Sequence, residues 1–214
     1  MSAHDDHTTS RNLTTLLDDL HALGDGGDIT IGDLLEAFHE RGFGVLLLIF
    51  ALPAAIPLPG LGINLIIAAP LVIISLQQAL GADYVRLPHR ICRRTISGDR
   101  IQAIVDRSRP WARRLEAILK PRLVFLTHGL SVHIIGLLGL LMALSVCVPL
   151  PLTNTVPSMG IAIMAAGLLA RDGLFVIAGA LIGALWVITL WGALLIYGME
   201  GLEWLHSQLS ALLP

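Results

Sequence analysis

Two proline-rich breaks interrupt long apolar stretches of the chain, and polar side chains stand beside both of them. Proline removes a backbone N–H donor and disrupts a helix, so each break leaves backbone groups that need partners. Amide and hydroxyl side chains can hydrogen-bond such groups or line a polar cavity with them. Binding of an ion or solute is therefore the chemistry to expect here. The candidate residues are Pro57, Pro59, Gly60, Asn64, Pro149, Pro151, Thr153 and Asn154.

Two interpretations of Asn64, Thr153 and Asn154 stay open. In the first, they line a cavity through which an ion or a small solute passes. In the second, they only satisfy the backbone groups that the prolines free, as often happens in broken membrane helices. A solvent-reachable polar cavity at the breaks would favour the first interpretation, and a dry, packed break would favour the second.

Few titratable side chains stand inside the apolar stretches. The titratable side chains of residues 129–170 are His133 and Cys147. Ionisable groups within a membrane are commonly functional, so a proton- or ion-linked role is one interpretation of His133. A histidine at the headgroup boundary is the other, since the residue lies about one helical turn from the start of the stretch. Arg171 and Asp172 form either a functional ion pair or a charged turn at a helix end.

No residue pattern indicates catalysis. Asp18 and Asp19 are expected on the outer side of a short helix without a partner, and the Gly-x-Gly at Gly60 lacks the rest of a phosphate-binding fingerprint. Cys92 lies in a basic segment and Cys147 in an apolar one, so neither a disulfide nor a Cys/His metal site is expected. We therefore expect a protein that is not an enzyme, with no catalytic residue, no metal and no cofactor.

The composition indicates an integral membrane protein. Apolar side chains make up 55% of the chain and charged ones 14%, whereas a soluble domain carries about 25% charged residues. Residues 43–82 contain no charged side chain at all, and apolar stretches of this length belong in a bilayer. Residues 1–11 lack an apolar core, so no cleaved signal peptide is expected.

Each break joins a short apolar segment to a longer one, and the order is reversed the second time. Residues 44–56 precede 63–80 in the first unit, whereas 130–148 precede 158–170 in the second. Thirteen residues form a helix of roughly 20 Å, which is too short for a hydrocarbon core of ~30 Å. We therefore predict two broken, re-entrant hairpins and a weak internal repeat, a pattern found at transporter binding sites.

The predicted fold class is all-α: a polytopic helical membrane protein with two Pro-broken hairpins, a further spanning helix and amphipathic interfacial helices. The segments expected, in order, are a disordered tail, cytoplasmic amphipathic helices, the first hairpin, a basic cytoplasmic connection, the second hairpin with the spanning helix, and an interfacial tail. Their boundaries are residues 1–10, 11–42, 43–82, 83–128, 129–198 and 199–214.

The connection between the hairpins is strongly basic. Eleven of the fourteen lysines and arginines lie between Arg86 and Arg122, which places this segment in the cytoplasm by the positive-inside rule. Helices are predicted to begin near Gly98 and again at Pro110, the second with Trp111 on its apolar side, as suits the headgroup region. The basic residues between Arg86 and Arg122 could also bind anionic lipid or an acidic polymer, although their role in membrane topology alone explains their concentration. The expected lipid-facing basic residues are Arg107, Arg113 and Arg114.

Two local patterns predict contacts within or between helices. Thr30 and Asp33 resemble a capping box at the start of a helix, with Asp in place of the usual Glu. Gly179 and Gly183 lie one turn apart in the spanning helix at residues 174–197 and permit close approach of another helix. That helix belongs either to a second copy in a homodimer or to the same chain.

Several motifs follow one another along the chain: Thr30–Leu35, Arg41–Gly44, Ala51–Pro53, Ile56–Gly60, Lys120–Leu123, Pro149–Asn154 and Ala170–Leu174. Together they resemble the bacterial exopolysaccharide-synthesis protein ExoD family over roughly residues 30 to 198. The resemblance implies a multi-pass protein of the bacterial inner membrane, surrounded by the lipid bilayer and associated with exopolysaccharide production. Two hypotheses follow: transport through a cavity at the paired breaks, or a scaffold or regulator that binds the polysaccharide-synthesis proteins. No nucleic-acid partner is expected.

Overall fold

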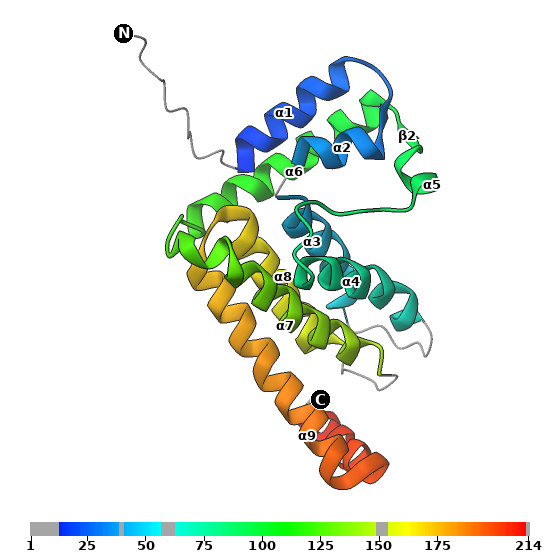
Figure 1. The fold of residues 1–214 in the computed structure, drawn as a ribbon, viewed down its shortest axis with the longest axis vertical. Helices are drawn as coiled ribbons and strands as arrows, with labels where there is room; N and C mark the ends of the chain where they lie inside the picture. Colours follow the sequence, from blue (N-terminus) through cyan, green and yellow to red (C-terminus); the bar gives the residue numbers. More distant parts are fainter. Residues whose placement is uncertain (1–12, 39–40, 57–62, 149–153, 213–214) are drawn as a thin grey trace. The chain divides into compact units, whose positions relative to one another are not determined.

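The computed structural model describes residues 13–38, 41–56, 63–148 and 154–212 (Figure 1). The chain divides into two compact units. Unit 1 comprises residues 1–37 and 88–118, and unit 2 comprises residues 38–87 and 119–214. The predicted all-helical fold is confirmed for the described residues, apart from one short two-stranded ladder in unit 1.

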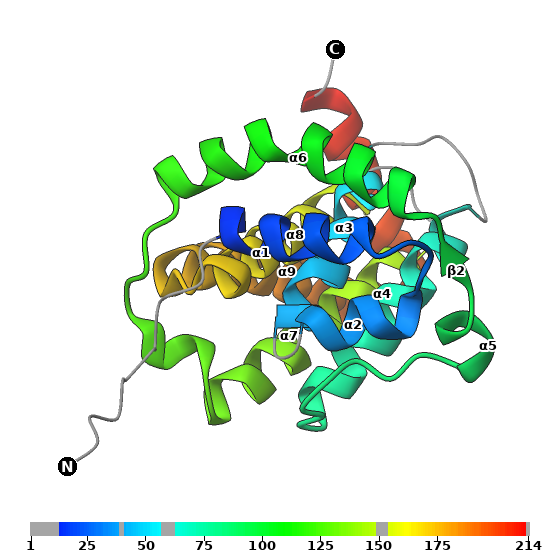
Figure 2. The ribbon, with the colours of Figure 1, turned by 90° about the horizontal axis from the view of Figure 1, so that it is seen from above.

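Unit 1 is built on two helices that pack side by side (Figure 2). Leu20 of α1 and Val105 of α6 are buried. The backbone N–H and the hydroxyl of Thr14 donate to Glu116 Oε1 at 2.8 and 2.9 Å. The elements of unit 1 are α1 (Leu13–Asp25), β1 (Ile29–Thr30), α2 (Ile31–Phe38), α5 (His89–Cys92), β2 (Thr95–Ile96) and α6 (Gly98–Ile118).

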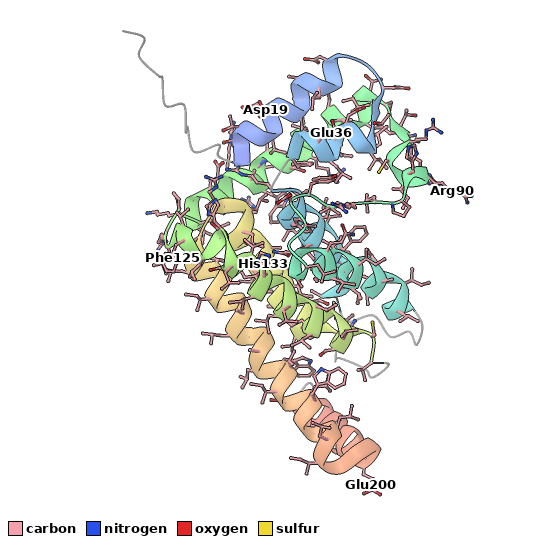
Figure 3. The ribbon with its side chains drawn as sticks, viewed as in Figure 1. Asp19, Glu36, Arg90, Phe125, His133 and Glu200 are labelled. Atoms are coloured by element: carbon pink, nitrogen blue, oxygen red, sulfur yellow. The ribbon has the colours of Figure 1, made fainter. Side chains whose placement is uncertain are left out.

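Two expectations about unit 1 were wrong. Asp18 has a partner, because Arg109 Nη1 lies 2.8 Å from its carboxylate, whereas Asp19 is exposed on the outside of α1 (Figure 3). Pro110 does not start a new helix, because α6 continues through it. Proline there removes one intrahelical hydrogen bond, and its exposed position allows water to satisfy the freed carbonyl.

The predicted capping box is confirmed at the start of α2. The Thr30 hydroxyl donates to Asp33 Oδ2 at 2.7 Å, and the Thr30 N–H donates to the same oxygen at 3.1 Å. In return, the Asp33 N–H donates to the Thr30 hydroxyl at 3.1 Å. The side-chain hydrogen bond, and then the backbone one, hold the pKa of Asp33 below its usual value. The antiparallel ladder of β1 and β2, with Thr30 opposite Thr95, leads into this cap.

We expect Thr30→Ala to raise the titration midpoint of Asp33 toward its ordinary value, because the hydroxyl donor is lost. A carboxyl whose pKa is lowered on folding stabilises the fold above its unfolded pKa, and this contribution is lost as the pH falls through the lowered value. Carboxyl ¹³C shifts against pH measure the midpoint. Thr95→Ala is the control across the ladder, and an Asp33 midpoint equal in all three proteins would contradict the assignment.

Unit 2 contains two helical hairpins whose arms pair across the unit. Helix α3 packs against α8, and α4 packs against α7. Gly44 near the start of α3 lies against Ala165 and Leu169 near the end of α8, so these two helices are antiparallel. Helix α8 has 16 residues and is nearly as long as α4 and α7, which have 17 each, so the prediction of a second short arm at residues 158–170 was wrong. The elements of unit 2 are α3 (Gly42–Ala54), α4 (Ile63–Ala79), η2 (Val124–Thr127), α7 (Leu130–Val146), α8 (Thr155–Ala170) and α9 (Gly173–Leu212).

Helix α9 contains the one segment, among the residues described, that is long and apolar enough to cross a bilayer, Gly173–Ile196. Its 24 residues extend roughly 36 Å, which exceeds a hydrocarbon core of ~30 Å. Leu181, Leu185 and Leu195 expose between 65% and 85% of their surface, as suits side chains that face lipid. Gly198 has non-helical angles (φ 60°, ψ −138°) and separates this segment from the helical tail.

The glycine pair in α9 receives helices of the same chain, which is the second of the two predicted alternatives. A Cβ at Gly179 would lie 2.6 Å from both Gly160 O and Met164 N of α8, and one at Gly183 would collide with Met142 of α7. These two glycines are therefore used inside unit 2, and the predicted homodimer draws no support from them.

Candidate functional site

A small pocket lies at one end of unit 2, where α3 and α7 begin and α4 and α8 end. We call it the arginine pocket, and its volume is about 50 Å³. This is room for roughly four waters, or for one small oxyanion. The described residues that line it are Arg41, Phe43, Gly44, Gln78, Thr127, His128, Val132, Leu168 and Arg171.

Arg171 occupies a backbone conformation that usually belongs to glycine. It follows the last residue of α8 with φ 55° and ψ 33°. Its N–H donates to Leu168 O at 3.3 Å, and the next N–H donates to Gly167 O at 2.8 Å, which together close the helix. At the matching position after α4 the chain uses Gly81 (φ 77°). A left-handed non-glycine residue costs roughly 1 kcal/mol.

Asp172 holds the turn that presents Arg171. Its carboxylate is fully buried and accepts hydrogen bonds from the N–H groups of Lys120 at 2.9 Å and Leu174 at 3.0 Å. Arg122 Nε lies 3.9 Å from it, and Arg122 O accepts the Gly173 N–H at 2.7 Å. Arg171 and Asp172 thus have different positions. Asp172 ties the turn to residues 120–122, as expected of a charged turn, whereas Arg171 lines the pocket.

Gln78 contributes a buried amide to the pocket. The residue is only 1% exposed, and both Nε2 and Oε1 are without a hydrogen-bond partner among the described residues. An unsatisfied buried polar group costs about 1–3 kcal/mol. The neighbouring Gln77 differs, because its amide donates to Arg86 O at 3.0 Å and accepts the Arg86 N–H at 2.6 Å.

His128 and Thr127 are partly committed to the backbone of η2. The Thr127 hydroxyl donates to Val124 O at 2.7 Å, and His128 Nδ1 lies 3.0 Å from the same carbonyl oxygen. The Thr127 hydroxyl oxygen also lies 3.0 Å from His128 Nδ1. In the tautomer that carries its proton on Nδ1, this nitrogen donates to Val124 O and Nε2 is an acceptor.

The pocket is suited to an anion. Two arginines line it, and none of its described lining residues is acidic. No carboxylate in the described part of the chain forms an ion pair with Arg171. The pocket also lies at the start of α3, where Arg41 makes no side-chain cap hydrogen bond, and a helix N-terminus favours negative charge. Within the described ranges, no His/Cys/Asp/Glu cluster could hold a metal ion.

Six of the eight break residues predicted as a site lie outside the described residues, namely Pro57, Pro59, Gly60, Pro149, Pro151 and Thr153. The backbone of Asn64 lies in the first turn of α4. Asn154 precedes α8, is 3% exposed and accepts the Ser158 N–H through its carbonyl at 3.1 Å. Because α3 and α8 are antiparallel, the helix ends that flank the two breaks lie at the same end of unit 2, opposite the arginine pocket.

The other predicted site residues lie outside the pocket. His133 is exposed in the first turn of α7 (Figure 3), where Nδ1 lies 3.2 Å from Gly129 O and the ring packs over Gly81. In unit 1, the predicted lipid-facing residues Arg107, Arg113 and Arg114 are all exposed on α6. The Arg114 guanidinium stacks on the Trp111 ring, 5.3 Å from its centre.

Sequence reasoning missed the pocket residues as a site, although one signal was present. Only three of the fourteen lysines and arginines lie outside residues 86–122, namely Arg11, Arg41 and Arg171. Two of these three line the pocket. Isolated cations at the ends of apolar helices, away from the basic segment that sets topology, could have marked this place.

An all-helical chain with one segment able to span a bilayer, and with large apolar side chains exposed along it, indicates a helical membrane protein. The profile of the family described as "Exopolysaccharide synthesis, ExoD" matches residues 13–192. The chain belongs to this family, as its motifs predicted, and the membership implies a part in exopolysaccharide synthesis.

Two curated relatives support the assignment. Protein ExoD of Rhizobium meliloti is 31% identical over 175 residues, which are 80% of this chain and 72% of that one. Protein slr1875 of a Synechocystis strain is 33% identical over 161 residues, or 75% of this chain and 76% of that one. No solved structure matches the chain.

Proposed function

We propose that this chain is a multi-pass protein of the bacterial inner membrane that serves exopolysaccharide synthesis by binding an anionic group in the arginine pocket, without catalysing a reaction. The observation that carries the proposal is that Arg171, at a left-handed position, lines the same pocket as Gln78, whose amide is unpartnered among the described residues. A site that keeps both a strained cation and an unsatisfied amide is built for a ligand rather than for stability.

The proposed orientation places the pocket and the basic segment on the cytoplasmic side. Apolar and cationic side chains share the exposed stripe of α6: Ile104, Trp111 and Ile118 expose 61%, 64% and 59% of their surface, with exposed Arg107 and Arg114 between them. Such a stripe favours the headgroup region of a membrane that carries anionic lipid. In this arrangement α9 crosses the bilayer, and the two hairpins enter it beside α9.

We propose that the pocket serves a regulator or adaptor of the polysaccharide-synthesis proteins, and transport through the paired breaks stays a separate proposal. The pocket is at the opposite end of unit 2 from the helix ends that flank the breaks, and it lies where a soluble partner could act on its occupancy. Self-association, as a dimer, remains a proposal that rests on no described contact.

Arg171→Gly tests this function, because glycine prefers the left-handed angles and only the guanidinium is lost. We expect the variant to accumulate in the membrane like the wild type and to lower exopolysaccharide output at least fivefold in a strain lacking its own copy, as loss of a charge-assisted contact predicts. Hexose in the culture supernatant per cell is the measurement, with immunoblots of the membrane fraction beside it.

Leu123→Gly is the matched control. Leu123 is the other non-glycine residue of the described chain with a positive φ (49°), and it does not line the pocket. We expect this variant to keep its exopolysaccharide output. Normal output from Arg171→Gly at normal protein level would show that the pocket is not needed.

A further inference from the structure

We infer that the ligand of the arginine pocket is a phosphate group that still carries a proton, as free hydrogen phosphate or as a phosphate monoester. This inference rests on the proposed function, in that it names the anion that the pocket binds. The hydrogen-bonding needs of Gln78 and His128 and the placement of the two arginines point to this ligand.

Gln78 requires a ligand that both accepts and donates hydrogen bonds. Its amide has an unpaired donor, Nε2, and an unpaired acceptor, Oε1, and exchanging the two atoms leaves the same requirement. Sulfate and carboxylates carry no proton near neutral pH and would leave Oε1 unsatisfied. Hydrogen phosphate retains an O–H, and a phosphate monoester keeps one on part of its population because its second pKa is roughly 6.

His128 strengthens this requirement. In the tautomer in which Nδ1 donates to Val124 O, 3.0 Å away, Nε2 is an acceptor. The pocket then combines two cationic donors, Arg41 and Arg171, with two neutral acceptors, Gln78 Oε1 and His128 Nε2. A tetrahedral ligand with four oxygens can meet groups that arrive from four helices, whereas a planar carboxylate offers only two oxygens.

The size of the pocket agrees with a single phosphate group. About 50 Å³ leaves no room for a sugar ring beside it. The remainder of a monoester would extend out of the pocket, past the exposed ring of His128. The structure therefore favours recognition of the phosphate group itself, with little selection of the group attached to it.

The test compares anions on the full-length protein in phosphatidylcholine nanodiscs. Thermal unfolding is followed by tryptophan fluorescence while inorganic phosphate or sulfate is added at constant ionic strength, because a ligand that binds the folded state raises the Tm saturably. We expect phosphate to bind at least about fivefold more tightly than sulfate, since only phosphate satisfies Gln78 Oε1.

Gln78→Met and Gln77→Met form a matched pair on the same helix, each replacing an amide by a side chain of similar shape. We expect Gln78→Met to raise the Tm without phosphate, because an unsatisfied amide is removed, and to weaken phosphate binding about tenfold, to the level of sulfate. Gln77→Met should instead lower the Tm, because its bonds to Arg86 are lost, and should bind phosphate like the wild type.

Nanodiscs that contain phosphatidic acid distinguish the two sources of the phosphate group. If the monoester belongs to a lipid, phosphatidic acid raises the Tm and removes the further effect of inorganic phosphate. If the ligand is soluble, inorganic phosphate acts equally in both kinds of nanodisc. Either result supports a phosphate site, provided that Arg171→Gly loses the effect.

Two results would overturn the inference, and they separate it from the proposed function. Equal binding of sulfate and phosphate, with both lost in Arg171→Gly, would leave an anion pocket but refute its selectivity for phosphate. Unchanged phosphate binding in Gln78→Met would refute the role of the amide. Unchanged binding of every anion in Arg171→Gly would remove the pocket as a site and the proposed function with it.

Discussion

Replacing Gly136 by alanine is expected to lower the Tm of the protein by roughly 10 °C, corresponding to about 3 kcal/mol of overpacking. Gly136 lies where α7 crosses the end of α4. A Cβ there would lie 2.7 Å from the Gln78 carbonyl carbon and 2.8 Å from Ala79 Cα. These are backbone atoms, so no side chain can rotate away, and the two helices must separate.

The control for this variant is Gly192→Ala in α9. Gly192 is also helical, but a Cβ there meets no atom within 4 Å. Alanine should therefore leave the Tm unchanged or raise it, since its higher helix propensity adds up to ~1 kcal/mol to the free energy of unfolding. Thermal unfolding of both variants in the same detergent is the measurement. Because Gln78 belongs to the disturbed contact, Gly136→Ala should also weaken phosphate binding. Equal Tm values for the two variants would contradict the close packing of α4 on α7.

Asp172→Ala is expected to destabilise unit 2 by about 2–6 kcal/mol, because two backbone N–H groups lose their acceptor at a cost of about 1–3 kcal/mol each. The variant would leave the N–H groups of Lys120 and Leu174 without an acceptor and Arg122 without its counterion. Residues 119–123 would then detach from the turn between α8 and α9. Arg171 would lose the support that directs it toward the pocket.

Limited trypsinolysis with mass spectrometry detects this detachment directly. We expect cleavage after Arg122 to accelerate in Asp172→Ala, together with a lower Tm. Asp83→Ala is the control, because Asp83 is an exposed carboxylate of the same unit. Protection of the Arg122–Leu123 bond equal to that in the wild type would show that the carboxylate does not hold this segment.

Much of the secondary structure could be predicted because its signals are local. The apolar segment predicted at residues 63–80 corresponds to α4 at Ile63–Ala79, and the one at 130–148 corresponds to α7 at Leu130–Val146. The capping box at Thr30 involves residues only three apart. Pro110 shows the limit of such signals, because packing of α6 against α1 keeps the helix continuous through a residue that locally favours a helix start.

The predicted site and the observed pocket differ for a physical reason. Proline breaks are visible in a sequence, whereas Gln77 and Gln78 look alike there and differ only in what surrounds them. One amide meets the Arg86 backbone, and the other is buried without a partner among the described residues. Hydrogen-bond satisfaction depends on neighbours that the fold supplies.

The sequence by itself determined that this chain is apolar enough for a membrane, which segments become helices, which family it belongs to, and that Arg41 and Arg171 stand apart from the basic segment. Only the tertiary structure decided that these two arginines line one pocket with Gln78. They are far apart in the chain, and they share a pocket because α3 pairs with α8 while α4 pairs with α7. That pairing arises from close helix packing at glycines, which local sequence patterns do not specify.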